Sequence, residues 1–194
     1  MATITNQAAL SYNGVTTLSN IAVGELVEVL TATKTAADTT YTAGGVKTFV
    51  ISLVNSSAAA LTGLTVTDTL GSYTFSGNTL YPLTYVTGSL LYYVNGALQA
   101  TPTVTATAPL TVTGVTVPAG GSAMLIYTAR VNEYAPLGVE DSITNTATIT
   151  GGGLTSSVTA TETINASPAP QLAISKSISP TMVAENGTLT YTLT

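Results

Sequence analysis

The chain has 194 residues, of which 45% are hydrophobic and only 7% are charged, and its formal net charge is -5. Four Lys and Arg residues in total cannot build the basic surface that neutralises a phosphate backbone, so we expect no nucleic-acid partner. Cys and His are absent, which excludes thiolate nucleophiles, disulfides, ordinary zinc sites and an imidazole base. We therefore expect neither an enzyme active site nor a cofactor.

The first residues, MATITNQ, contain neither the cationic nor the apolar region of a secretory signal peptide. We expect a chain without a signal peptide, whose leader was removed or whose export is unconventional. No run of residues approaches the length of a membrane span.

Thr, Ala, Val, Leu, Ser and Gly dominate the sequence, a mixture that favours strands over helices. No window of helix length carries apolar residues at the helical period. In chain order the sequence predicts strands at Val46–Val54 and Leu61–Leu70, a hairpin over Leu90–Leu98 that turns at Asn95-Gly96, and strands at Leu110–Val117 and Ala123–Val131. Short strands between turn signals predict an all-β sandwich.

Two internal matches, both spaced by about 140 residues, reveal a repeat. Near the start, Ile4–Ala8 matches Ile143–Ala147, and near the end Ala43–Ser52 matches Glu185–Thr194. The chain thus begins with the closing strands of one repeat and stops in the opening strands of another, because Thr194 matches Ser52 in mid-strand. We expect a truncated last repeat.

The repeat divides the chain into four predicted segments. The first segment, 1–28, holds closing strands and is a possible donor strand. A complete sandwich repeat follows at 29–165, then a linker at 166–171 and the opening strands of an incomplete repeat at 172–194. The Pro-containing stretch Asn165–Pro170 is the basis for the linker.

Four short motifs together resemble a known family. They are Thr33-Lys34-Thr35, Val66–Leu70, Val117–Gly121 and Asn145–Thr148. The chain resembles the conserved-repeat domains of bacterial surface proteins known as domain of unknown function 11. The resemblance implies an immunoglobulin-like β-sandwich, often in tandem, on the cell surface or in spore appendages, and it implies no established activity.

Three polar residues occupy positions that strand alternation assigns to the inner faces. Lys34 shares a face with Leu30, Asp68 shares one with Val66, and Asn145 shares one with Ile143. Burying an unpaired charge costs several kcal/mol or more, so compensation is expected.

We therefore hypothesise an intramolecular isopeptide bond between Lys34 and Asn145. Burial lowers the pKa of the Lys34 amine and frees its lone pair, while a protonated Asp68 polarises the Asn145 carboxamide and shuttles protons as ammonia leaves. Two alternatives stay open: a non-covalent buried cluster, and outward-facing polar residues at strand ends, with Asp68 starting a turn.

The partial repeats suggest assembly. An apolar strand without its own sheet is an assembly element, so Ile4–Leu10 is predicted to insert into the incomplete C-terminal unit of another copy. Head-to-tail contacts of this kind generate filaments. The repeat also places Asn6 opposite Lys176 of the neighbour, which makes an interchain isopeptide bond conceivable. The sequence thus predicts a homo-oligomeric structural subunit of a surface or spore-associated filament.

Other functions are alternatives to a filament subunit. The N-terminal strands could instead pack on the complete repeat of their own chain, giving a monomeric stalk. An adhesin could bind a glycan or protein through the aromatic stretch Tyr73–Tyr93, with Tyr81 and Tyr85 as its test positions. Calcium could bind Glu140-Asp141 with Asp38 or Glu133, but the spacing fits no known loop, so we expect no metal site.

Overall fold

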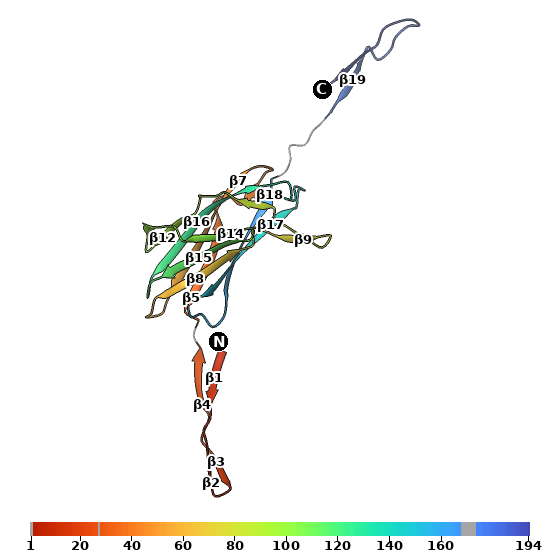
Figure 1. Cartoon of the computed structure of the whole chain (residues 1–194). Helices are drawn as coiled ribbons and strands as arrows, with labels where there is room; N and C mark the ends of the chain where they lie inside the picture. Colours follow the sequence, from red (N-terminus) through yellow and green to blue (C-terminus); the bar gives the residue numbers. More distant parts are fainter. Residues whose placement is uncertain (1, 27, 168–173) are drawn as a thin grey trace.

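The protein is described from a computed structural model, which covers residues 2–26, 28–167 and 174–194 (Figure 1). Every regular element within these ranges is a β-strand, which confirms the predicted all-β class. None of the segments so described forms a helix long and apolar enough to cross a membrane.

A sandwich of two sheets forms the centre of the molecule. The first sheet has the order β13-β12-β16-β7-β5, with β11 also paired to β16, and the second has the order β14-β15-β8-β17-β18-β6. The first sheet contains β5 (Leu30–Ala36), β7 (Val46–Asn55), β11 (Leu83–Tyr85), β12 (Leu91–Val94), β13 (Ala97–Gln99) and β16 (Ser122–Val131). The second contains β6 (Thr40–Tyr41), β8 (Leu61–Asp68), β14 (Thr103–Thr107), β15 (Leu110–Val117), β17 (Ser142–Gly151) and β18 (Val158–Ala166). Within both sheets the pairing is antiparallel apart from the parallel contact of β18 with β6.

Along the strands, buried residues alternate with more exposed ones, and the buried side chains fill the space between the sheets. In β17, Ile143, Asn145, Ala147 and Ile149 are buried, while the Thr residues between them are exposed or half-buried. Thr is β-branched and therefore favours strands, and its hydroxyl group is compatible with the solvent on the outer face. The inner faces of both sheets therefore form one apolar core.

Turn chemistry holds the strands in register at two places. Asn95 and Gly96 both have positive φ, 47° and 80°, which confirms the predicted two-residue hairpin turn. Between the predicted strands Val46–Val54 and Leu61–Leu70, the Asn55 side chain is fully buried. Its Nδ2 donates to the carbonyls of Ala59 and Pro118. Asn55 therefore joins the β7–β8 turn to the turn that follows β15.

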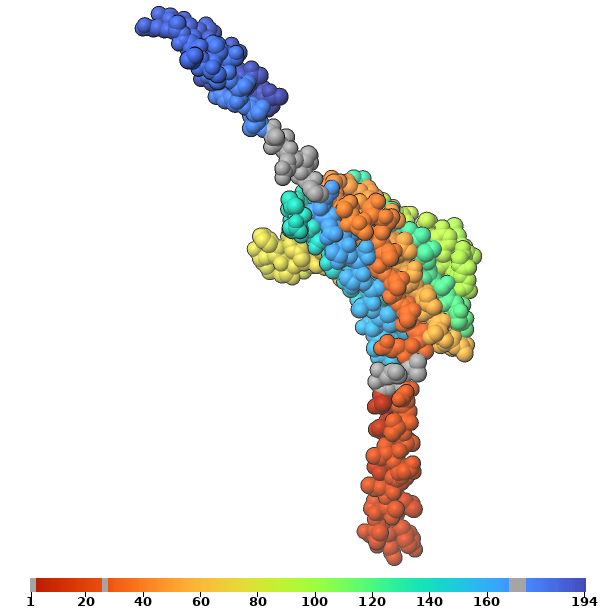
Figure 2. Space-filling view, turned by 180° about the vertical axis from the view of Figure 1, so that it is seen from behind, coloured from red at the N-terminus to blue at the C-terminus, as the bar shows by residue number. Residues whose placement is uncertain are grey.

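A hairpin extends from each end of the sandwich (Figures 1 and 2). At the N-terminus, β1 (Ala2–Asn6) pairs with β4 (Ala22–Leu26) and β2 (Ala9–Tyr12) pairs with β3 (Val15–Leu18). At the C-terminus, β19 (Lys176–Ser179) pairs with β20 (Thr190–Leu193). A further small hairpin, β9 (Tyr73–Phe75) with β10 (Asn78–Leu80), projects from the side of the sandwich.

The C-terminal hairpin reproduces the opening hairpin of the complete repeat. Lys176 pairs with Leu193 as Lys34 pairs with Ile51, and Ile178 pairs with Tyr191 as Ala36 pairs with Phe49. The sequence match between these segments therefore extends to their strand register.

Three expectations about the terminal segments are revised or left outside the structure. Ile4–Leu10 is not a lone strand, because β1 and β2 are already paired within their own hairpin. Nor does this segment pack on the complete repeat, since Ile4 and Leu10 are 59% and 73% exposed. Of the predicted linker 166–171, Ala166 ends β18, and residues 168–171 lie outside the described ranges, as do 172 and 173.

Candidate functional site: a buried polar cluster between the sheets

Lys34, Asp68 and Asn145 all point into the sandwich. They come from three strands: β5 of the first sheet, and β8 and β17 of the second. Their exposed fractions are 4%, 1% and 0%. In a chain with only four cationic side chains, one is therefore placed in the core.

One hydroxyl group joins these three side chains. Lys34 Nζ is paired with Asp68 Oδ2. Tyr127, on β16, has its hydroxyl 2.7 Å from Asp68 Oδ2, 3.3 Å from Lys34 Nζ and 3.0 Å from Asn145 Nδ2. The Asn145 amide donates to the Tyr127 oxygen, and the Tyr127 hydroxyl donates to Asp68. Lys34 and Asn145 thus meet at the same phenol.

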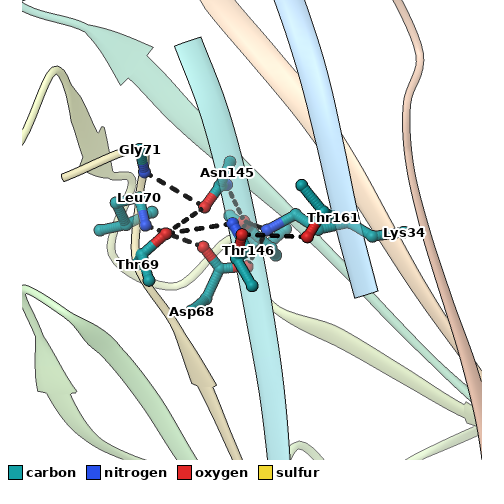
Figure 3. A network of polar contacts seen from close by, with 9 residues as sticks. Lys34, Asp68, Thr69, Leu70, Gly71, Asn145, Thr146 and Thr161 are labelled. Carbon is teal, nitrogen blue, oxygen red and sulfur yellow. Dashed lines mark hydrogen bonds and ion pairs between the residues drawn. The ribbon is translucent and has the colours of Figure 1, made fainter. Parts of the chain in front are cut away.

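The carbonyl of Asn145 points the opposite way, toward a turn at the end of β8 (Figure 3). Gly71 N–H and the Thr69 hydroxyl donate to Asn145 Oδ1 at 3.2 and 3.3 Å. Leu70 and Gly71 both have positive φ, 52° and 71°, and this conformation turns the Gly71 N–H inward. The sharp turn therefore supplies two donors to one amide oxygen.

The turn is fixed to β17 by further hydrogen bonds. Thr69 N–H donates to the carbonyl of Thr146 at 2.9 Å, and Thr146 N–H donates to Thr69 Oγ1 at 3.0 Å. Asp68 Oδ1 accepts the Leu70 N–H at 3.0 Å. Asp68 therefore starts a turn, as one alternative proposed. The outward orientation in that alternative is wrong, because Lys34, Asp68 and Asn145 are all buried.

The electrostatics of the cluster follow from its burial. Burial lowers the pKa of the Lys34 amine, and the nearby Asp68 carboxylate offsets part of that effect. Burial raises the pKa of the Tyr127 phenol well above its usual value, and the Asp68 carboxylate adds to the shift. Lys34 Nζ also lies 5.2 Å from the ring centroid of Phe49, which stabilises the ammonium form. Burial therefore makes the Lys34 amine easier to deprotonate and keeps the Tyr127 phenol protonated.

Sequence reasoning missed three members of this cluster: Tyr127, Thr69 and Gly71. Tyr127 lies in the predicted strand Ala123–Val131, where its phase places it on the apolar face. A buried tyrosine hydroxyl needs a polar partner, and this requirement was the available signal. Nothing in the sequence indicated that the residues after Asp68 would reach Asn145.

The other candidate residues lie elsewhere. Asn6 is exposed on β1 and Lys176 is exposed on β19, so the two lie at opposite ends of the chain (Figure 1). Lys176 Nζ lies 4.3 Å from the ring centroid of Tyr191, the repeat counterpart of Phe49. The described residues contain no group of three or more acidic side chains placed to hold a metal. Tyr85 is 6% exposed, so it cannot form the ligand surface considered above.

The fold and this inter-sheet cluster define an immunoglobulin-like sandwich protein with a polar site in its core. No protein-family model and no curated protein matches the sequence, so the resemblance to the conserved-repeat surface family is not confirmed.

Solved structures do resemble the chain. A variant of BcpA, the major pilin subunit of Bacillus cereus, superposes with a TM-score of 0.50 at 15% identity, over 89% of this chain and 50% of that one. The pilus backbone protein RrgB of Streptococcus pneumoniae gives a TM-score of 0.49 at 14% identity, over 62% of this chain and 31% of that one. The chain therefore spans half or less of these pilins, and its likeness to the BcpA variant extends to the fold alone.

Proposed function

We propose that the chain is a structural subunit of a bacterial surface or spore-associated filament, assembled head to tail through its terminal hairpins. The observation that carries this proposal is the pair of two-stranded hairpins whose apolar side chains face solvent. Ile4, Leu10 and Val15 are exposed at the N-terminus, and Ile174 and Leu193 at the C-terminus. Among the residues that the structure describes, these strands form only two-stranded sheets, and apolar strands of this kind favour pairing with another chain.

A second copy of the chain is the occupant that fits these hairpins. By sequence match, the N-terminal hairpin corresponds to β17–β18 and the C-terminal hairpin to β5–β7. Inside the complete repeat, β18 lies beside β5. In two copies placed head to tail, the C-terminal hairpin of one copy would meet the N-terminal hairpin of the next, as β5–β7 meets β17–β18 within the complete repeat. The contact propagates because each copy keeps one unused hairpin.

The buried cluster supports covalent strengthening of the complete repeat. The Lys34 amine attacks the Asn145 carboxamide carbon, an isopeptide bond replaces the Asn145 amide, and ammonia leaves. Asp68 takes the proton that Lys34 must lose. The bond would tie β5 of one sheet to β17 of the other. Its interchain counterpart would join Lys176 of one copy to Asn6 of the next.

Filament assembly can be tested on the full chain by electron microscopy and gel filtration. Ile4→Asp places a charge on the apolar face of β1 and should abolish filaments. Thr5→Asp places the same charge on the opposite face and should leave them intact. Filaments that persist in Ile4→Asp would exclude docking through this face, and a wild-type chain that stays monomeric would instead favour a stalk module.

The covalent bond has a direct signature in the intact mass of the denatured protein. Wild type should weigh about 17 Da less than its sequence, the mass of one ammonia. Lys34→Met and Asn145→Ala should keep the full mass, whereas Lys47→Met, which removes a lysine on β7 outside the cluster, should still lose 17 Da. A full-mass wild type would leave a non-covalent cluster as the remaining description.

A further inference from the structure

We infer that Tyr127 is the proton donor to the leaving ammonia, and that Thr69 and Gly71 form an oxyanion hole for Asn145. This inference rests on the isopeptide bond proposed above and assigns roles to residues outside the Lys34, Asp68 and Asn145 triad. The Asn145 amide is oriented so that its oxygen and its nitrogen face different partners.

The nitrogen end of the amide faces Tyr127 rather than Asp68. The Tyr127 hydroxyl lies 3.0 Å from Asn145 Nδ2 and 2.7 Å from Asp68 Oδ2. A proton held on Asp68 therefore reaches the leaving nitrogen through one intervening hydroxyl. Burial keeps this phenol protonated, so it can pass one proton on as it accepts another.

The oxygen end of the amide faces two donors. Thr69 Oγ1 already accepts the Thr146 N–H, so its own hydrogen is free to point at Asn145 Oδ1. Gly71 N–H is the second donor. Both donors are fixed before reaction by the turn and its bonds to β17. When the amine attacks and the carbonyl oxygen gains negative charge, preorganised donors of this kind stabilise it.

The proton balance of the reaction closes within these residues. The Lys34 ammonium first gives one proton to the Asp68 carboxylate, and the neutral amine then forms the C–N bond to Asn145 Cγ. The Asp68 proton passes through Tyr127 to the Asn145 nitrogen, whose C–N bond breaks to release ammonia. The Asp68 carboxylate finally takes the second proton of the attacking nitrogen. The products are a neutral amide, ammonia and a protonated Asp68, without any external reactant.

The rate of bond formation tests these roles. The full chain is made by cell-free translation, samples are stopped in acid at successive times, and the fraction that has lost 17 Da is read by intact mass. Tyr127→Phe should slow the loss by about 100-fold or more. The matched control is Tyr92→Phe, which removes a buried hydroxyl that donates to the Thr116 carbonyl, and it should react at the wild-type rate.

Thr69 gives an independent measurement if Tyr127→Phe does not fold. Thr69→Val should slow the reaction by about 100-fold, and Thr69→Ser, which retains the hydroxyl, should restore most of the rate. Circular dichroism of each variant confirms that it is folded.

The outcomes separate this inference from the proposal on which it rests. A wild-type chain that keeps its full mass, or that loses 18 Da through a Lys34–Asp68 bond, overturns both. A wild-type chain that loses 17 Da while Tyr127→Phe reacts equally fast overturns only the relay through Tyr127. Equal rates for Thr69→Val and wild type overturn only the oxyanion hole.

Discussion

Asp68 shows how one side chain can serve local structure and chemistry at once. Its Oδ1 accepts the Leu70 N–H and fixes the turn, while its Oδ2 faces Lys34 and Tyr127. A buried cation and a buried carboxylate are tolerable only as partners, because removing one leaves the other uncompensated. The cluster is therefore expected to be sensitive to every substitution that leaves a single charge behind.

The protonation of the Lys34 amine makes the free energy of unfolding depend on pH. In Asn145→Ala the amine stays unreacted, and its pKa in the folded protein is lowered below 10.5. The unfolded chain then binds more protons than the folded chain between the two values. The free energy of unfolding should therefore rise as pH increases through the lowered pKa toward 10, by at most about 1.4 kcal/mol per pH unit.

Urea unfolding at a series of pH values below 10 measures this slope. Above that range the raised pKa of Tyr127 acts in the opposite direction, because the unfolded phenol ionises first. Adding Lys34→Met to Asn145→Ala should remove the slope. A flat profile in Asn145→Ala alone would contradict the lowered pKa of Lys34.

At the scale of elements, the turn after β8 is tightly constrained. Gly71 has a φ of 71°, and a Cβ at this position would lie 2.3 Å from Ile143 Cγ2. Ile143 is two residues before Asn145 on β17. The turn thus depends on glycine both for its backbone conformation and for close approach to the strand that carries Asn145.

Gly71→Ala should lower the free energy of unfolding by about 3 kcal/mol, because left-handed strain adds to a steric clash in the core. Gly77→Ala is the matched control: its φ is 80°, but nothing lies within 4 Å of the added Cβ. Its cost should be about 1 kcal/mol. Equal losses in the two variants, measured by chemical denaturation, would show that the contact with Ile143 is unimportant.

At the scale of the whole molecule, the proposed bond would connect the two sheets. Its two residues lie near opposite ends of the complete repeat in the sequence. Joining Lys34 to Asn145 closes a loop of about 110 residues. In the chain-entropy account, a cross-link closing a loop of this length stabilises the folded state by about 4–5 kcal/mol. A filament under tension would gain a connection that does not rely on hydrogen bonds.

Lys34→Met and Asn145→Ala should each lower the thermal midpoint markedly. Because each removes the same bond, the double variant should be little worse than Lys34→Met alone, which also leaves Asp68 unpaired. The two losses should therefore be strongly non-additive. Asn165→Ala, an exposed position on β18, is the control and should unfold like wild type. Additive losses in the cycle would indicate two independent contributions and no shared bond.

The sequence by itself determined the strand class and the repeat, and it predicted the inward phase of Lys34, Asp68 and Asn145. These features depend on a two-residue period and on local turn chemistry, which the chain carries without reference to distant partners. It could not show that Tyr127, Thr69 and Gly71 complete the cluster. Their meeting depends on how two sheets stack and where a turn folds back, and many non-local contacts decide that together.

For the terminal segments, too, the sequence determined one part and the tertiary structure decided the rest. The sequence match assigned them to closing and opening strands of a repeat, and the register of β19 with β20 agrees with that assignment. Only the tertiary structure decided that the first segment pairs with itself as a hairpin and leaves its apolar side chains in solvent. A strand binds whichever edge lies nearest in space, and in this chain the nearest edge belongs to its own hairpin.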